Sequence, residues 1–426
     1  MLLPPDAELI RRDPAVPGLA TLLEPEAFLA ALSACRPEAD FESARITYVK
    51  YKPGTNCLVG YQLEVAGASL DVYAKAYPCT AQNKLRKARE QPSVPGPLGP
   101  GRIVLEDCAV VVSVFPNDSK VTTLACVADA EARERVLREL VPNRPDLWGG
   151  TVQRLVYKPE RRYVGRVITD DGPRAALKVY TEDEYCASRR NGEAFQSHGP
   201  FRIAPLLGRS DSHRMLAFEW LPERPLSEVI SDPELDLNAV AIAGAGIAAL
   251  HAQEPQGLAC RSRQTEAAGL VSEATWLGFV CPRLASQAAA LAQRLAARLM
   301  REPALDRPIH GDLHARQVLL GGGTVTILDL DRAVRGDPAA DLGNFIAHLQ
   351  REVVRGNLPP GRVDRLKHAL LEGYRAATGR AIPAQLDLYI AAGLFGLALR
   401  FFRYAEPEWA ERAAATLERA EAILKA

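Results

Sequence analysis

Two kinds of periodicity divide this chain near residue 222. Before that point apolar and polar residues mostly alternate, which is typical of strands with one buried face. After it, apolar residues recur at helical spacing around one predicted hairpin near 317–329. The sequence therefore predicts an α+β fold in which a small sheet-rich region precedes a large helical one. Helices are expected near 237–253, 281–301, 338–351, 360–377, 383–403 and 406–425.

The first half contains a candidate internal repeat. Two segments, YKPGTNCLVG from Tyr51 and YKPERRYVG from Tyr157, each lie in a hairpin pattern with Lys-Pro at the turn. The strand that carries Lys75 matches the strand that carries Lys178, a helical stretch follows each, and 109–116 matches 215–222. These matches predict a duplicated strand-strand-strand-helix-strand unit. The alternative is two unrelated sheets that share hairpin chemistry.

Length and composition fit a globular protein with more than one domain. The chain has 426 residues, of which 47% are apolar. Its 52 basic residues balance its 52 acidic residues, so no global field would steer it to nucleic acid or to an anionic membrane. We expect neither as a partner.

The N-terminus and the cysteines indicate a reducing compartment. No basic segment followed by an apolar one opens the chain, and the longest small-apolar stretch, 239–250, is shorter than the ~20 residues that span a bilayer. The eight cysteines form no Cys-x-x-Cys pair and have no histidine clustered with them, which argues against disulfides and zinc. We expect a cytoplasmic protein with reduced, mostly buried thiols.

One short segment carries the residue types that phosphoryl transfer requires. His310-Gly-Asp-Leu-His-Ala-Arg-Gln317 is followed by an apolar strand that ends in Asp329-Leu-Asp331. Kinase chemistry needs one carboxylate to accept the hydroxyl proton, and an amide and a second carboxylate to hold Mg²⁺ on the phosphates. Asp312, Gln317 and Asp329 supply these groups in the required order.

This segment and the GDPAAD run that ends at Asp341 resemble the aminoglycoside phosphotransferase and choline kinase-like superfamily over about residues 305–350. The superfamily's motifs are HGDLHxxN, IDW or IDFE, and GDPxxDLA. The maltokinase-like branch has Gln in place of the Asn, as this chain does at Gln317. The resemblance implies a protein-kinase-like two-lobed fold, ATP and Mg²⁺ as cofactors, Asp312 as catalytic base and Asp329 as the principal metal ligand.

Physical roles can also be assigned from residue type. Asp312 must lie within hydrogen-bond reach of the acceptor hydroxyl, which it orients and whose proton it accepts late. Gln317 offers the same carbonyl oxygen as Asn on a longer stem, and this suits a hard cation. Asp331 is a second candidate metal ligand, with a hairpin-end or helix-cap role as the alternative. We expect His310 to brace the loop and Asp341 to anchor it to the next helix.

A kinase-like site also needs a cation on the phosphates, held by a carboxylate from a helix. Lys178 lies among apolar residues of a predicted strand, where burial is costly unless the ammonium group is paired. We expect Glu193, in the following helix, to be that partner. The alternative places Lys178 on the solvent face of an edge strand.

Two further segments would contact the nucleotide. The turn KPERRY occupies the place of a glycine-rich phosphate loop but has no glycine, which leaves Arg161 or Arg162 to contact the phosphates through side chains. Solvent exposure of both arginines is the alternative. The segment FEWLP resembles the hinge between kinase lobes, where adenine would pair with backbone groups of Glu219 and Leu221.

Three regions follow from these assignments. We expect an N-terminal cap domain over 1–145 that is a degenerate, non-catalytic copy of the small lobe, then the N-lobe over 146–222 and a helical C-lobe over 223–426. Proline-rich segments at 91–100 and 141–145 would form an internal loop and the linker before the N-lobe.

The expected function is an ATP-dependent kinase for a hydroxyl of a small molecule, either a sugar or polyol or an aminoglycoside. Overall neutrality favours an uncharged acceptor. The alternative is a catalytically impaired, nucleotide-binding regulatory protein of the same fold, for which Gln317 and the glycine-free turn are the evidence. A protein kinase is disfavoured because no Asp-Phe-Gly or Ala-Pro-Glu segment brackets an activation loop. The oligomeric state stays open.

Overall fold

The computed structural model describes residues 2–303 and 305–425, which form two compact units. The first unit comprises the chain up to residue 184 together with 208–217 and 401–410. The second comprises the described residues of 185–207, 218–400 and 411–425. No helix among the described residues is long and apolar enough to cross a membrane.

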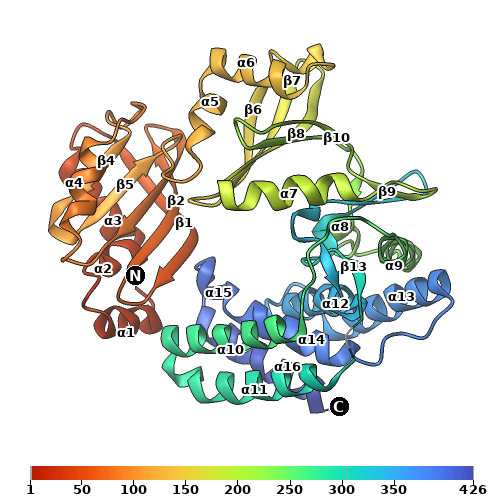
Figure 1. Cartoon of the computed structure of the whole chain (residues 1–426). Helices are drawn as coiled ribbons and strands as arrows, with labels where there is room; N and C mark the ends of the chain where they lie inside the picture. The colour runs from red at the N-terminus through yellow and green to blue at the C-terminus, as the bar shows by residue number, and fades with distance from the viewer. Residues whose placement is uncertain (1, 304, 426) are drawn as a thin grey trace. The chain divides into compact units, whose positions relative to one another are not determined.

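An antiparallel five-stranded sheet, here the first sheet, opens the first unit (Figure 1). Its strand order is β1-β2-β3-β5-β4, and helix α4 (Gln82–Glu90) follows the third strand. The proline-rich segment 91–100 connects α4 to β4, as expected. The strands are β1 (Phe41–Lys52), β2 (Asn56–Val65), β3 (Ala68–Ala76), β4 (Arg102–Leu105) and β5 (Val110–Val114).

A second five-stranded sheet repeats this topology. Its order is β10-β11-β8-β7-β6, which is the order of the first sheet read from the opposite edge, and helix α7 (Glu182–Ala194) again follows the third strand. The internal repeat is therefore confirmed, with one short edge strand in each copy, β4 and β10, that the sequence pattern did not reveal. The strands are β6 (Thr151–Lys158), β7 (Arg162–Thr169), β8 (Gly172–Tyr180), β10 (Leu206–Ser210) and β11 (Met215–Glu219).

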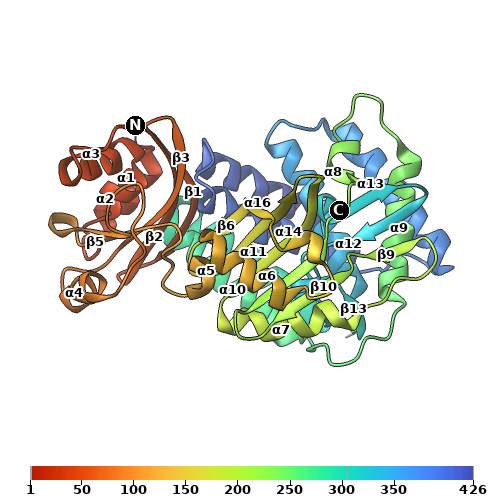
Figure 2. The ribbon, with the colours of Figure 1, turned by 90° about the horizontal axis from the view of Figure 1, so that it is seen from above.

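Apart from α4, which bears out the helical stretch predicted after the Lys75 strand, the helices in the first 140 residues were not predicted from the sequence. The short helices α1–α3 lie beside the first sheet in both views of the ribbon (Figures 1 and 2), where the ring of Phe28 stacks on Tyr61 with centroids 4.1 Å apart. Each is too short to show a helical period over several turns, which explains the error. The helices are α1 (Pro4–Arg12), α2 (Leu19–Leu23), α3 (Pro25–Cys35), α5 (Ala125–Ala128) and α6 (Ala130–Leu140).

Long helices dominate the second unit. Helices α9 and α13 pack so closely that a Cβ at Gly373 would lie 1.9 Å from the carbonyl oxygen of Ala241. Helix α10 was not predicted, because glycines at 269 and 278 interrupt its apolar pattern. The helices are α8 (Leu226–Val229), α9 (Leu237–His251), α10 (Arg263–Val280), α11 (Ala285–Arg301), α12 (Pro338–Val354), α13 (Pro360–Thr378), α14 (Leu386–Ala398), α15 (Arg400–Arg403) and α16 (Trp409–Lys425).

Short strands in the second unit hold the predicted catalytic segment. Strand β13 (Arg307–Ile309) pairs with β16 (Val334–Gly336), and the hairpin of β14 (Val318–Gly321) and β15 (Thr324–Ile327) confirms the turn predicted near 317–329. Strand β9 (Phe201–Ile203) pairs with β15, and β12 (Arg224–Pro225) pairs with β14. The loop after β13 and the loop after β15 thus start from one compact framework.

The cysteine prediction is half right. All eight cysteines are free thiols, as expected, but only Cys57 and Cys281 are buried. Cysteines at 35, 79, 186 and 260 are exposed. Their positions near helix ends and in loops carry no periodic signal from which burial could be predicted.

Candidate active site

The loop from His310 to Gln317 is held by the carboxylate of Asp341 on α12. Its two oxygens accept hydrogen bonds from the backbone N–H of His310 at 2.6 Å and of Gly311 at 2.9 Å. His251 on α9 lies 3.0 Å away through Nε2. Burial alone would raise the pKa of Asp341, but these partners outweigh it and its pKa lies below the usual value. The expected anchoring role of Asp341 is confirmed.

His310 braces two loops at once. Its Nε2 lies 2.8 Å from the carbonyl oxygen of Leu328, and its Nδ1 accepts from the backbone N–H of Asp312 at 3.3 Å. These contacts fit the tautomer with the proton on Nε2. Because Leu328 directly precedes Asp329, the His310 ring fixes the distance between the loops of the two predicted catalytic carboxylates.

Asp312 is paired with a residue that the sequence did not suggest. An Nη of Arg400, at the start of α15, donates to Asp312 Oδ1 at 3.2 Å. Burial would raise the pKa of Asp312, but the guanidinium groups of Arg400 and Arg332 lower it below its usual value. Asp312 is therefore ionised at neutral pH, the state that can accept a proton.

Gln317 and Asp329 lie side by side. The Nε2 of Gln317, which ends the 3₁₀ turn Ala315–Gln317, donates to Asp329 Oδ2 at 3.2 Å. Asp329 has a left-handed backbone with φ of 59°, which turns its side chain out of the strand direction. Asp331 lies in the next 3₁₀ turn, Leu330–Arg332. The structure thus places the amide and the first carboxylate of the predicted metal set together.

The donor atoms of this pair fit a divalent cation with oxygen ligands. Carboxylate and amide oxygens are what Mg²⁺ prefers, and the ion usually keeps several ligands from water and phosphate. Among the described residues no group of three or more His, Cys, Asp or Glu side chains gathers at metal-binding distance. One or two carboxylates and an amide would fill only part of the coordination shell of Mg²⁺. Oxygen atoms of the nucleotide phosphates would fill the rest.

His314, two residues after Asp312, packs on a second histidine. The rings of His314 and of His348 on α12 have centroids 4.6 Å apart. Burial lowers the pKa of His314 to about 4 and lowers that of His348 well below its usual value, so both rings are neutral at pH 7. Asp312 therefore has the cation of Arg400 and the neutral ring of His314 among its neighbours.

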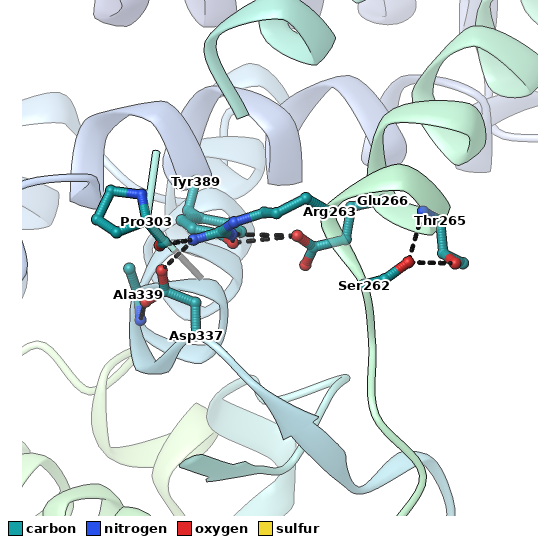
Figure 3. A network of polar contacts seen from close by, with 8 residues as sticks. All are labelled: Ser262, Arg263, Thr265, Glu266, Pro303, Asp337, Ala339 and Tyr389. Atoms are coloured by element: carbon teal, nitrogen blue, oxygen red, sulfur yellow. Dashed lines mark hydrogen bonds and ion pairs between the residues drawn. The ribbon is translucent and has the colours of Figure 1, made fainter. Parts of the chain in front are cut away.

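Figure 3 shows the polar network that holds the start of α12. Arg263 donates to the buried carboxylate of Asp337 at 2.7 Å, to the carbonyl oxygen of Pro303 at 2.9 Å, and to the hydroxyl of Tyr389. Glu266 lies 3.2 Å from both Arg263 and Tyr389. Asp337 itself caps α12 by accepting from the backbone N–H of Ala339 at 2.9 Å. Arg263 therefore fixes the helix from which Asp341 holds the catalytic loop.

Helix α7 is attached to the segment that follows Asp329. The Nδ2 of Asn191, a buried residue of α7, donates to the carbonyl oxygens of Asp331 at 3.2 Å and Ala333 at 2.9 Å. Glu193, the predicted partner of Lys178, is two residues further along the same helix. Lys178 lies in β8 and is buried, which rules out the solvent-face alternative. Their pairing stays a prediction.

The two predicted phosphate-contacting arginines flank the β6–β7 turn. Arg161 donates through Nε to Glu184 at 2.7 Å, and Arg162 is the first residue of β7. A phosphate contact by Arg161 would compete with this ion pair. Their contact with a nucleotide stays a prediction.

The predicted hinge borders a cavity. Glu219 ends β11, and its backbone N–H donates to the carbonyl oxygen of Pro205 at 2.9 Å, so that amide is already engaged. Beside it lies a cavity of about 290 Å³ whose lining includes Leu221, Glu223 and Thr326. Asp312 and Asp329 do not line this cavity, so it is distinct from the catalytic loop.

Comparison with protein families identifies the fold of this site. The model for the phosphotransferase enzyme family matches residues 151–383, which is more than half of the chain. The chain belongs to this family. The match starts at the first strand of the second sheet and leaves the first sheet outside it. This family match confirms the resemblance to the aminoglycoside phosphotransferase and choline kinase-like superfamily that the motifs indicated.

Several solved structures are similar to this chain. A thermostable mutant of the aminoglycoside phosphotransferase APH(4)-Ia is 16% identical, with a TM-score of 0.51 over 68% of this chain and 98% of that one. The macrolide 2′-phosphotransferase MphH from Brachybacterium faecium is 19% identical, with a TM-score of 0.44 over 68% and 98%. The choline kinase from Cryptosporidium parvum is 11% identical, with a TM-score of 0.49 over 70% and 96%.

The first of these likenesses confirms the two-lobed, kinase-like α+β fold of this family member. None of the curated proteins matches the chain significantly.

Sequence reasoning missed Arg400 and Arg263. Arg400 is 88 positions from Asp312 along the chain, inside a helical run whose pattern indicates only packing. Arg263 belongs to the helix that was not predicted. Arg400 stands between Leu399 and Phe401, whereas Arg263 stands between Ser262 and Gln264, and neither sequence context identifies a charge partner.

Proposed function

We propose that this protein is an ATP-dependent phosphotransferase that transfers the γ-phosphate to a hydroxyl group of a small molecule. The observation that carries this proposal is the arrangement of three residues from two loops. Asp312 is ionised beside Arg400, while Gln317 and Asp329 lie 3.2 Å apart, and His310 ties the two loops together. This arrangement contains the base and the metal-binding groups that the reaction requires.

In this mechanism Asp312 accepts a hydrogen bond from the acceptor hydroxyl, orients its oxygen for attack on the phosphorus, and accepts the proton late. Asp329 and Gln317 would hold Mg²⁺, with Asp331 as a second carboxylate. When bound, the ion would neutralise charge on the phosphate oxygens. Lys178, oriented by Glu193, would contact the phosphates from β8, and backbone groups of Glu219 and Leu221 would bind the adenine.

The acceptor is a sugar or polyol, or an aminoglycoside, and the charges near Asp312 favour the former. The guanidinium of Arg400 and the neutral ring of His314 lie near the base, and a polycationic acceptor would meet Arg400 directly. An uncharged polyol would instead find hydrogen-bond partners there.

The test is ADP release with a panel of sugars, polyols, aminoglycosides and amino alcohols. Asp312→Asn is expected to lower turnover of any accepted substrate by at least about a hundredfold, whereas Asp364→Asn, at an exposed position of α13, leaves it unchanged. If nucleotide binds without Mg²⁺ dependence, no acceptor stimulates turnover and Asp329→Ala leaves binding unchanged, the protein is instead a nucleotide-binding regulatory protein of the same fold.

A further inference from the structure

The first sheet holds the glycine-free turn of the second sheet through a buried ion pair. The Nζ of Lys75, on β3, lies 2.7 and 2.9 Å from the two carboxylate oxygens of Glu160. Glu160 belongs to the turn between β6 and β7, which the sequence predicts to stand in the place of a phosphate loop. Lys75 stands where Lys178 stands in the other copy of the repeat: each lies near the end of the third strand, two residues before a tyrosine.

Other groups of the first unit converge on the same turn. Ser119 donates through Oγ to Glu160 at 2.9 Å. The buried carboxylate of Asp118 accepts through one oxygen from the backbone N–H of Glu160 and from the hydroxyl of Tyr157, each at 2.8 Å. The other oxygen accepts from the backbone N–H groups of residues 120 and 121. Both the side chain and the backbone of the turn are thus fixed by residues of the segment after β5.

The conformation of the turn needs such support. Glu160 has a φ of 55°, a left-handed conformation that costs free energy for a residue with a side chain. Its carboxylate is only 7% exposed. Burial alone would raise the pKa of Glu160, but Lys75, Ser119 and Lys120 lower it below the usual value, so the Glu160 carboxylate is ionised at neutral pH.

We propose that Lys75 is a positioning residue for nucleotide binding, through which the first sheet takes over the work of a glycine-rich loop. This inference rests on the proposed function and on the prediction that Arg161 or Arg162, beside this turn, contacts the nucleotide phosphates. A glycine-rich loop uses flexible backbone to wrap phosphates and loses that freedom on binding. Here the turn is ordered in advance, so the neighbouring Arg161 and Arg162 are presented without that loss.

The experiment uses the full chain, with AMP-PNP and Mg²⁺ binding measured by calorimetry and intrinsic ATP hydrolysis measured in parallel. Lys75→Met and Glu160→Gln are each expected to weaken AMP-PNP binding about tenfold and to raise KM for ATP similarly, with kcat changed less than about threefold. The double variant is expected to match the single ones, and Lys75→Arg to restore most of the affinity.

A matched control separates positioning from stability. Arg154 on β6 and Asp71 on β3 form a 2.9 Å ion pair that joins the same two sheets away from the turn. Asp71→Asn is expected to leave AMP-PNP affinity within about twofold, because it does not touch the turn. If Lys75→Met does not fold, Ser119→Ala, which removes one hydrogen bond to the same carboxylate, is expected to weaken binding about threefold.

The outcomes separate this inference from the function on which it rests. If the wild-type protein binds AMP-PNP but Lys75→Met, or Ser119→Ala in its place, binds it equally well, the inference is wrong and the proposed function stands. An equal loss of affinity in Asp71→Asn also overturns the inference. If the wild-type protein binds no AMP-PNP, both are wrong.

Discussion

The amide nitrogen of Gln317 donates to a carboxylate oxygen of Asp329 at 3.2 Å. The longer stem of glutamine therefore reaches the carboxylate that is the proposed principal metal ligand. In this orientation the amide carbonyl points away from Asp329. Rotation of the amide about its last side-chain torsion would place the carbonyl oxygen where the nitrogen now lies, beside Asp329. A bound metal ion would favour this rotamer because it binds the oxygen and not the nitrogen.

Removal of the Gln317 amide is expected to weaken metal use more than nucleotide binding. We predict that Gln317→Ala lowers turnover about a hundredfold and raises the Mg²⁺ concentration at half-maximal rate, whereas Gln317→Asn stays within about tenfold of wild type. Mg²⁺ titrations of turnover measure both effects. Gln293→Ala, at an exposed position of α11, is the control. An unchanged Mg²⁺ requirement in Gln317→Ala would contradict the assignment.

Arg400 is expected to set the acidic limb of the pH–rate profile. Since the guanidinium keeps the pKa of Asp312 below its usual value, Asp312 stays ionised into mild acid. Arg400→Gln removes the larger of the two guanidinium contributions that oppose burial, so the pKa of Asp312 rises and the acidic limb moves to higher pH. We predict a larger loss of kcat/KM near pH 5.5 than near pH 8. An equal loss at both values would mean that Arg400 acts on the acceptor alone.

Arg263 is expected to stabilise the fold through the network in Figure 3. Arg263→Met leaves Asp337, which is 2% exposed, without its cation, and this should lower the free energy of unfolding by about 3–5 kcal/mol. Urea denaturation measures the change, and the double variant with Asp337→Asn should recover part of it. Arg375→Met breaks the exposed pair with Glu372 on α13 and should change nothing measurable. Equal effects of the two single variants would contradict the prediction.

Asp6 gives the stability a defined pH dependence. Burial raises the pKa of Asp6 to about 6, against the hydrogen bond that Trp409 Nε1 donates to it at 3.1 Å. A carboxyl whose folded pKa exceeds its unfolded pKa stabilises the fold when protonated, and this contribution is lost as pH rises from about 4 to about 6. Asp6→Asn is therefore expected to be more stable than wild type at pH 7.5, by at most about 2–3 kcal/mol.

That difference should fall below about 1 kcal/mol near pH 4, where wild-type Asp6 is protonated in the folded state and about half protonated in the unfolded state. Urea denaturation at the two pH values measures it. Glu8→Gln, at a residue of the same helix with a 43% exposed side chain, should show no such pH dependence. A difference that is the same at both pH values would show that the carboxyl is not the cause.

Local sequence signals predicted those parts of the molecule in which chain order and spatial order coincide. The motif from His310 to Asp331 is compact along the chain, so its two loops, the hairpin between them and the Asp341 anchor followed from spacing. The duplication followed from two copies of one hairpin turn. Helix α10 and the short helices before β1 lacked a clean period.

Long-range ion pairs could not be predicted from the sequence. Arg400 pairs with Asp312 over 88 positions of the chain, and Lys75 pairs with Glu160 over 85. In each case the two charges meet because distant helices, strands and turns pack together. Local periodicity does not predict which of these elements become neighbours. Single charged residues in helices and turns are usually solvated, so neither stood out. The three-dimensional arrangement was needed to connect them.

The two hydrogen bonds from Asn191 have a consequence for control. An outward swing of α7 would break both and strand the buried amide, at a cost of about 1–3 kcal/mol for each group left unpaired. A regulatory switch that displaced this helix would have to supply that free energy. The end of α7 is thus held to the backbone of the segment after Asp329, which makes this helix a poor element for a switch that works by displacement.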